Sequence, residues 1–196
     1  MVHGIGINDK GVHKCFDYSS GKKVPTMEYL AWKGCIRRCY SPFTQKRQPQ
    51  YIGCTVSESF RRFQCFAEWC NQQIGFGNKG WHLDKDILTK GNKIYSEDTC
   101  CFVPHEINIL LTSGKIRRGS CPIGVSFNKR EGKYKVSCKR EAKSVHLGYY
   151  VCVDSAFSAY KTFKESVIKE AANKWKDKID PRAYEALMNY QVEITD

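Results

Sequence analysis

The sequence predicts an α+β fold, and three patterns in the chain lead to this class. Apolar residues recur at helical spacing over residues 27–40 and 57–73, as they do in amphipathic helices. Two strand-like stretches and a helical stretch follow one another over residues 81–108. Three short strands and a long helix follow over residues 124–175. We therefore expect a ββα unit in the N-terminal half and a small three-stranded antiparallel sheet with a packed helix in the C-terminal half.

The two strand-containing regions are expected to form separate domains. A chain of 196 residues can build one large or two small domains with their own cores. Serine, glycine and arginine residues interrupt the apolar periodicity between the two regions, as is typical of a linker. We predict a first domain at residues 1–112, a linker at 113–121, and a second domain at 122–196 that includes C-terminal helices.

The first domain is expected to begin with an irregular arm, because residues 1–24 are polar with scattered glycines. Pro25 suits the start of a helix at residues 27–40. A polar basic loop at 41–50 and a short strand at 51–56 are expected next.

A helix at residues 57–73 should then pack on the core, since its apolar stripe is largely aromatic. The stripe consists of Phe60, Phe63, Phe66, Ala67 and Cys70. A strand at 81–88, a turn at Gly91-Asn92 and a short strand near Ile94 are predicted to follow. A helix is expected from about Ser96.

The second domain is predicted from three strands at residues 124–128, 133–139 and 145–150. Asp154 is a suitable cap for a helix at 155–175, whose apolar residues recur at helical spacing. A last helix should run from Asp180-Pro181 to about Tyr190.

The positive charge of the chain is unevenly distributed. The net charge is +12, and residues 118–153 alone carry 8 Lys/Arg against 2 Asp/Glu. Segregated positive charge favours a polyanionic partner, here double-stranded DNA, over a membrane surface or an acidic protein. No apolar run has the length of a membrane span or resembles the core of a signal peptide, so a cytoplasmic protein without a membrane partner is expected.

The eleven cysteines do not predict a disulfide scaffold. Their number is odd and no signal peptide precedes them, so free thiols, several of them buried, are expected. Two paired CxxC motifs would be strong evidence for a structural zinc site, and this chain has none. The spacings Cys35-x3-Cys39, Cys65-x4-Cys70 and Cys100-Cys101 make zinc an unlikely cofactor, although Cys39, Cys54 and Cys100 remain free to converge in space.

Two carboxylates, Asp84 and Asp86, lie at the end of the strand predicted at 81–88. Carboxylate oxygens are ligands that Mg²⁺ prefers, so both are candidate magnesium ligands. A metal ion held on a β-hairpin that precedes a helix can stabilise charge on a scissile phosphate while a general base activates water. The order of acidic residues, turn and expected helix fits that arrangement.

The stretch from Leu83 to Asn108 resembles the HNH (His-Me finger) homing-endonuclease-like proteins of bacteriophages, and the likeness extends over residues 28–110. It is most specific in Leu83-Asp84-Lys85-Asp86 and in Tyr95-Ser96…Cys100. The resemblance implies a ββα-metal finger that hydrolyses DNA phosphodiester bonds with a divalent ion. The metal ligand that the family places on the helix falls near Thr99, with Asn108 as a substitute further along.

The chain departs from this family at the general base, because Lys85 follows Asp84 where the family has a histidine. A lysine acts as a base at neutral pH only if burial or like charge strongly depresses its pKa. We therefore expect Lys85 to contact phosphate, with transition-state stabilisation or a plain surface charge as alternatives. His82 lies two residues before Asp84 and is the other candidate base, although its position also suits an ordinary surface histidine.

Four short motifs in the second half resemble the integrase-type DNA-binding domain of the APETALA/ethylene-response-factor kind, which recurs fused to HNH nucleases. The motifs are Ile123-Gly124-Val125, Gly132-Lys133-Tyr134, His146-Leu147-Gly148-Tyr149-Tyr150 and Ala156…Ala159-Tyr160. The likeness implies a sheet that binds DNA.

Strand periodicity independently predicts which side chains of this sheet face the helix and which face solvent. The side chains expected to face the helix are Val125, Tyr134, Val136, Leu147 and Tyr149. The cations expected to contact DNA are Lys129, Arg130, Lys133, Lys135, Lys139 and Arg140, with Arg130 and Arg140 as the strongest candidates. A solvated charged face is the alternative explanation for any single lysine.

Three functions remain open at this level. The first is a phage-type HNH endonuclease that uses Mg²⁺, which the resemblance favours slightly. The second is a catalytically inactive DNA-binding or regulatory protein that retains the finger as a scaffold, which the replacement of the base by Lys85 favours. The third is an inhibitor or adaptor that binds a host protein through its basic face.

Overall fold

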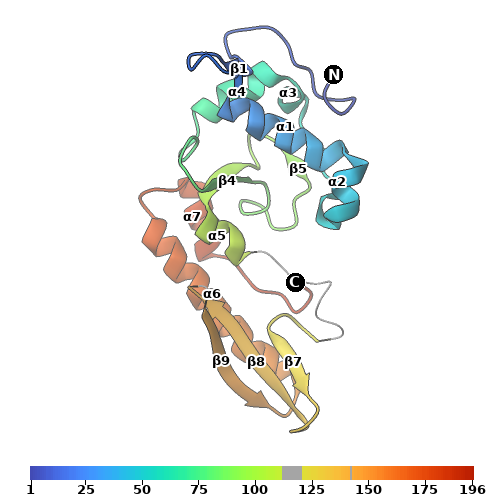
Figure 1. The fold of residues 1–196 in the computed structure, drawn as a ribbon. Coiled ribbons are helices and arrows are strands. Elements are labelled where there is room, and N and C mark those ends of the chain that lie inside the picture. The colour runs from blue at the N-terminus through green and yellow to red at the C-terminus, as the bar shows by residue number, and fades with distance from the viewer. Residues whose placement is uncertain (112–120, 142) are drawn as a thin grey trace. The chain divides into compact units, whose positions relative to one another are not determined.

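The computed structural model describes residues 1–111, 121–141 and 143–196 and combines helices with small sheets, which confirms the α+β class (Figure 1). The chain forms two compact units: unit 1 comprises Met1–His105 and Lys178–Ala183, and unit 2 comprises Glu106–Asp177 and Tyr184–Asp196. Except for Cys121, the linker predicted at 113–121 lies outside the described residues. No helix in the described part of the chain is long and apolar enough to span a membrane.

Unit 1 contains helix α1 (Met27–Tyr40), whose bounds match the prediction. The Thr26 side chain caps it by accepting the N–H of Tyr29. Trp32 is fully buried, and its indole N–H donates to the carbonyl of Phe60 at 2.9 Å.

A short helix, α2 (Pro42–Arg47), and a 3-10 turn, η1 (Pro49–Tyr51), replace the loop predicted at 41–50. The prediction was wrong because the Ser41 hydroxyl accepts the N–H of Thr44 and a proline occupies the first turn, two features that start a helix. The strand predicted over 51–56 is reduced to β3 (Thr55–Val56).

The single helix predicted at 57–73 is in fact two, α3 (Glu58–Arg61) and α4 (Phe63–Asn71). Arg62 between them has extended backbone angles, φ −91° and ψ 125°. The backbone of Ile7 donates to the carbonyl before Arg62 at 2.7 Å and accepts the N–H after it at 3.0 Å. A distant segment therefore interrupts the helix. The predicted packing role of the aromatic stripe is confirmed, since its phenylalanines are buried.

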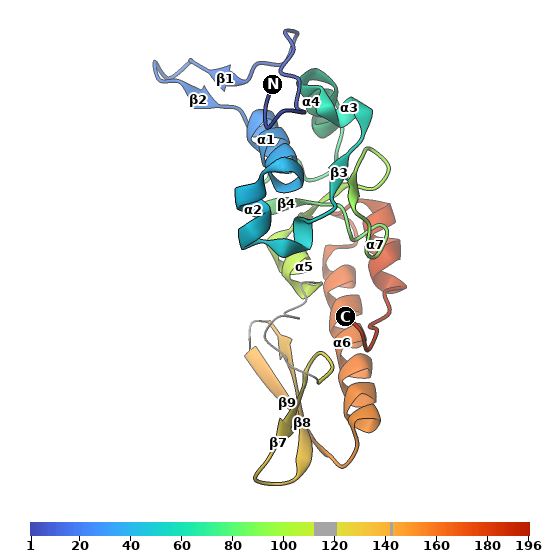
Figure 2. The ribbon, with the colours of Figure 1, turned by 90° about the vertical axis from the view of Figure 1, so that its right-hand side faces the viewer.

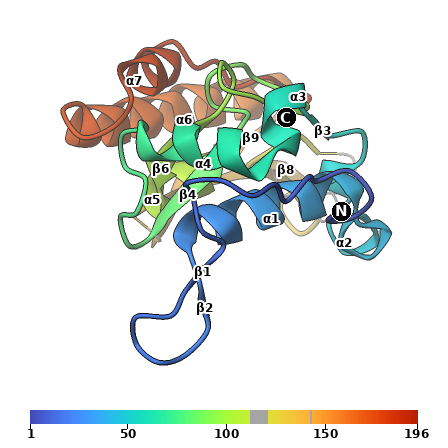
Figure 3. The same cartoon turned by 90° about the horizontal axis from the view of Figure 1, so that it is seen from above.

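The N-terminal arm predicted at 1–24 is more ordered than expected. Strands β1 (Phe16–Asp17) and β2 (Val24–Pro25) form an antiparallel hairpin, whose loop extends away from α1 (Figure 3). Val2 and Ile5 pack against the aromatic core of unit 1.

The region predicted as a hairpin and helix has a different strand pairing. Strand β4 (Trp81–Asp84) pairs antiparallel with β6 (Cys101–Pro104), while β5 (Ile94–Tyr95) pairs parallel with β3. The helix expected from Ser96 is instead a turn followed by β6, and α5 (His105–Leu110) begins directly after that strand. All four residues of β6 are buried, as in the short apolar runs that form buried strands.

Unit 2 is an antiparallel sheet of β7 (Val125–Asn128), β8 (Lys133–Arg140) and β9 (Lys143–Tyr150), in the order β7-β8-β9. Figure 2 shows the sheet alongside the long helix α6 (Val153–Trp175). Helix α7 (Pro181–Met188) starts in the segment that belongs to unit 1 and ends in unit 2.

The core of unit 2 lies between one face of the sheet and α6. Val136 and Cys138 of β8 and Tyr160 of α6 are buried there. Gly124 precedes the sheet with φ +75°, and a Cβ at this position would lie 2.0 Å from a ring carbon of Tyr160. Glycine is therefore required by both its backbone conformation and its closeness to the helix.

Candidate nucleic-acid interface and acidic loop

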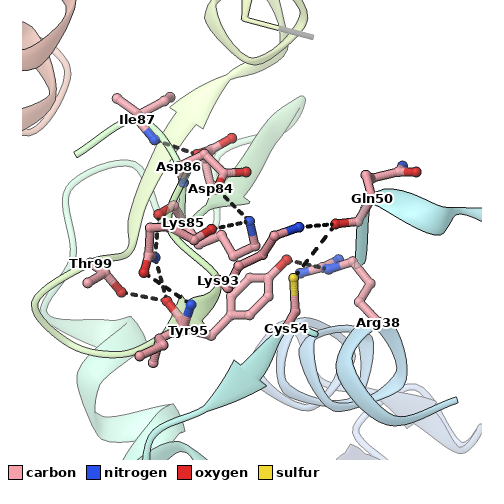
Figure 4. Close-up of polar contacts among 12 residues, drawn as sticks. Arg38, Gln50, Cys54, Asp84, Lys85, Asp86, Ile87, Lys93, Tyr95 and Thr99 are labelled. Carbon is pink, nitrogen blue, oxygen red and sulfur yellow. Dashed lines mark hydrogen bonds and ion pairs between the residues drawn. The ribbon is translucent and has the colours of Figure 1, made fainter. Parts of the chain in front are cut away.

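Asp84 ends strand β4 with its carboxylate turned onto the following backbone (Figure 4). Its Oδ1 accepts the N–H of Asp86 at 2.6 Å and the N–H of Ile87 at 2.9 Å. The second oxygen, Oδ2, takes part in neither bond. Burial raises the pKa of Asp84, and the two backbone hydrogen bonds partly oppose this effect.

Lys85 points into the protein, and only 5% of it is exposed. Its ammonium donates to Asp86 Oδ1 at 2.5 Å and to the carbonyl of Asn92 at 2.9 Å, and it lies 5.8 Å from the ring centroid of Tyr95. Asn92 in turn donates to the carbonyl of Lys85 at 2.8 Å. These bonds close the loop at residues 85–100, so Lys85 does not occupy the surface position that the expected phosphate contact requires.

The loop is attached to the helices of unit 1 by two further contacts (Figure 4). The Nε of Arg38 on α1 donates to the hydroxyl of Tyr95 at 2.9 Å. The ammonium of Lys93 donates to the carbonyl of Gln50 in η1 at 2.8 Å. Burial of the Tyr95 phenol raises its pKa, so the phenol is neutral beside the cations Arg38 and Lys85.

His82 is exposed on β4, and its ring centroid lies 5.1 Å from that of His105. His82 pairs with Val103, and Asp84 pairs with Cys101, in the β4–β6 register. His105 follows β6 directly, so this register brings the two imidazoles together. The contact was missed in the sequence because it depends on the pairing of β4 with β6 across residues 85–100.

The three candidate magnesium ligands have unequal surroundings. Asp84 has one carboxylate oxygen outside its turn, whereas Asp86 is half exposed with its Oδ1 held by Lys85. Asn108 lies on α5 in unit 2. Within the described residues, no group of three or more His, Cys, Asp or Glu side chains is arranged to hold a metal ion. Asp84 thus suits a divalent ion as one ligand, and the described carboxylates do not complete a site.

The thiols near this loop are poor zinc ligands. Cys54 and Cys100 are buried, and burial raises the pKa of Cys54 and raises that of Cys100 to about 12. Zinc binds thiolates, which such an environment disfavours. A hydrogen bond from Cys35 lowers the pKa of Cys39, but the neighbouring cations Arg38 and Lys85 that share in this effect would repel a metal ion.

The face of the sheet that points away from α6, here called the outward face, carries most of the predicted DNA-contacting cations. Lys133, Lys135 and Lys139 alternate along β8 with the buried Val136 and Cys138 and are exposed. Lys129 and Arg130 are exposed in the turn between β7 and β8. None of these five cations forms an ion pair with a residue in the described part of the chain.

Arg140 differs from the other predicted contacts. Its guanidinium pairs with Glu170 of α6 at 2.9 Å, with both side chains half exposed. A phosphate would have to compete with that carboxylate, so Arg140 is less available than Lys139 beside it.

A β-bulge between Val136 and Ser137 changes which residues of β9 share the outward face. Tyr149 lies opposite Lys135 and His146 lies opposite Ser137. Without the bulge, residues three apart would point to opposite faces. Instead the two rings contact each other, with centroids 4.9 Å apart.

The predicted inward orientation of Tyr149 was therefore wrong. Tyr149 is 41% exposed, and Tyr150 occupies the inward position opposite Tyr134. Sequence reasoning missed Tyr149 as a surface residue because strict alternation with Leu147 was assumed. A glycine inside a strand pattern often marks a bulge, so Gly148 is the signal in the sequence. In the structure its φ is +123°.

Comparison of the chain with protein-family models, with curated proteins and with solved structures finds no match in any of the three.

Proposed function

We propose that this protein binds double-stranded DNA through the outward face of the β7–β9 sheet. The observation that carries the proposal is the row of exposed lysines on β8, which form no ion pairs among the described residues. Alternate residues on a strand are about 7 Å apart, and a twisted antiparallel ribbon of this size fits the major groove. Tyr149 and His146 add surface for contacts to bases within the same face.

The salt dependence of DNA binding tests this proposal. A variant with Lys133→Gln, Lys135→Gln and Lys139→Gln should bind duplex DNA more weakly. The slope of log affinity against log salt should fall by about 3, because each lost phosphate contact contributes about 0.9. A control with Lys22→Gln, Lys79→Gln and Lys169→Gln removes the same charge from other exposed positions. An equal change in both variants would contradict a role for the sheet.

We further propose that the β4–β6 strand pair and its loop are the site of metal-dependent hydrolysis of a DNA phosphodiester bond, as in HNH endonucleases. Asp84 would hold Mg²⁺ through the oxygen not used in its turn, and Asp86 is the other candidate ligand in unit 1. The bound ion would stabilise negative charge on the phosphate. His82, exposed on the same strand, would accept a proton from water.

A catalytically inactive DNA-binding protein is the second candidate, and one observation favours it. Lys85 takes the place of the family's histidine and is used to close the loop through Asp86 and Asn92. Nicking of supercoiled plasmid with Mg²⁺ or Mn²⁺ separates the two functions. Cleavage by the wild type that Asp84→Ala and His82→Ala abolish supports the nuclease. Tight DNA binding without cleavage supports the inactive protein, and binding too weak to detect at physiological salt supports an adaptor for a host protein.

A further inference from the structure

Unit 1 carries a second group of exposed cations in a stretch that contains no carboxylate. No Asp or Glu occurs between Glu28 and Glu58. Helices α1 and α2 contribute the exposed cations of this stretch, Lys33, Arg37, Lys46 and Arg47. None of the four forms an ion pair with a residue that the structure describes. We call these four cations together with Phe43 the α1–α2 surface.

These cations lie on two consecutive helices that meet at Ser41. Ser41 ends α1 and caps α2, and its hydroxyl accepts the N–H of Thr44 at 3.3 Å. Figures 1 and 3 show α2 continuing directly from the end of α1. Lys33 and Arg37 are one helical turn apart on the exposed side of α1.

An aromatic ring is exposed beside one of these cations. Phe43 is 69% exposed, and the guanidinium carbon of Arg47 lies 5.3 Å from its ring centroid. Cations in the last turn of a helix stabilise the helix dipole, which accounts for Arg37, Lys46 and Arg47 in a protein without a partner. That explanation leaves Lys33 and the exposed ring unaccounted for. Cations that follow a backbone beside an aromatic ring that stacks on a base are typical of single-stranded nucleic-acid sites.

The α1–α2 surface belongs to the same unit as Asp84 and is joined to its loop. Arg38, next to Arg37 on α1, donates to Tyr95, and Lys93 donates to Gln50 shortly after α2. A strand bound on this surface is therefore held by the unit that carries Asp84, independently of the sheet in unit 2.

We propose that the α1–α2 surface is a second DNA contact, in which the four cations bind the sugar-phosphate backbone and Phe43 stacks on an unpaired base. The inference rests on the proposed DNA-binding function. It adds that the chain binds single-stranded or locally opened DNA through unit 1 as well as duplex through the sheet.

The test uses the full chain with two oligonucleotides, a duplex and a single strand. A variant with Lys33→Gln, Arg37→Gln, Lys46→Gln and Arg47→Gln should reduce the salt slope for single-stranded DNA by about 3, at about 0.7 for each contact. A control with Lys10→Gln, Lys22→Gln, Lys79→Gln and Lys169→Gln makes the same change in net charge at exposed positions elsewhere. Thermal unfolding of both variants shows whether either loses its fold.

Phe43→Leu separates stacking from general electrostatic attraction. It should weaken single-strand binding at least about fivefold and leave duplex binding unchanged, because leucine retains apolar bulk without a stacking face. Tyr18→Leu, at another exposed aromatic residue of unit 1, should change neither. Equal effects of the two charge variants, or of the two aromatic variants, would overturn the inference. If the wild type binds neither DNA, the proposed function itself fails. If the β8 lysine variant loses DNA binding and the α1–α2 variant does not, only the second contact is refuted.

Discussion

Two features of its surroundings shift the pKa of Asp84 in opposite directions. Burial disfavours the ionised form and raises its pKa, while the N–H groups of Asp86 and Ile87 favour that form. A neutral side chain of the same shape would keep the turn without the cost of a buried charge. The ionised carboxylate therefore lowers the stability of the folded protein at neutral pH.

Asp84→Asn should increase the free energy of unfolding at pH 7. The folded pKa lies above the unfolded value of about 3.8, so the stability that protonation provides is present below pH 3.8 and is lost as pH rises through the folded pKa. Asparagine does not ionise, and its Oδ1 still accepts the two N–H groups. Urea unfolding at pH 7 and pH 3.5 should show a gain only at the higher pH. Asp98→Asn, at an exposed site, is the control, and a loss of stability at pH 7 in Asp84→Asn would contradict this account.

Gly124 illustrates a residue whose requirement comes from a neighbour in space. Gly124→Ala should destabilise unit 2 by roughly 2 kcal/mol or more, because positive φ and a clash with Tyr160 act together. Gly132→Ala, also at positive φ but with open space around a Cβ, should cost only about 1 kcal/mol. Denaturant unfolding of the two variants compares them, and equal losses would show that the closeness of Tyr160 is unimportant.

At the scale of elements, interruptions of regular helices and strands position the residues of the candidate sites. The bulge in β8–β9 brings His146 and Tyr149 onto one face, and the bridge from Ile7 divides α3 from α4. Strand β6, where a helix is predicted, provides the partner for β4 and so places Asp84 at the start of a closed loop.

Tyr149 and Tyr150, adjacent on β9, test the orientation that the bulge imposes. Tyr149→Ala should change the free energy of unfolding by less than about 0.5 kcal/mol but weaken DNA binding, because its ring lies on the outward face. Tyr150→Ala should destabilise the protein by roughly 2 kcal/mol, since its ring is partly buried opposite Tyr134. Denaturant unfolding and DNA titration of the folded variants provide the two readouts. The reverse pattern would mean that β9 has the regular alternation.

At the scale of the whole molecule, all eleven cysteines are free, and their exposure divides them into classes. Cys65 and Cys152 are exposed, and Cys15 and Cys121 are partly exposed. The others are buried, and they are Cys35, Cys39, Cys54, Cys70, Cys100, Cys101 and Cys138. Hydrogen bonds from Ser155 lower the pKa of Cys152, which increases its thiolate fraction near neutral pH.

Thiol titration of the native protein should therefore show Cys152 reacting first and Cys65 second. The advantage of Cys152 should shrink as pH rises above about 9, where an ordinary thiol also ionises. Cys152→Ser should remove the fastest phase alone. All eleven thiols should react in denaturant, and unfolding midpoints should not depend on a reductant. A midpoint that falls on reduction would reveal a disulfide.

Local pattern by itself determined much of this protein. Local spacing predicted helix α1, the three strands of unit 2 and the packing role of the aromatic stripe. The spacing of apolar residues along one segment determines whether they share one face of a helix or of a strand. The positive charge of β8 and the carboxylate of Asp84 could also be identified, because charged side chains are read directly from the sequence.

Tertiary structure alone decided how distant segments meet. The pairing of β4 with β6 across the loop at 85–100, the burial of Lys85 against Tyr95, and the outward position of Tyr149 depend on contacts between residues that no local period relates. Strand pairing and cation burial are set by the free energy of the assembled core, to which each segment contributes only when its partners are in place.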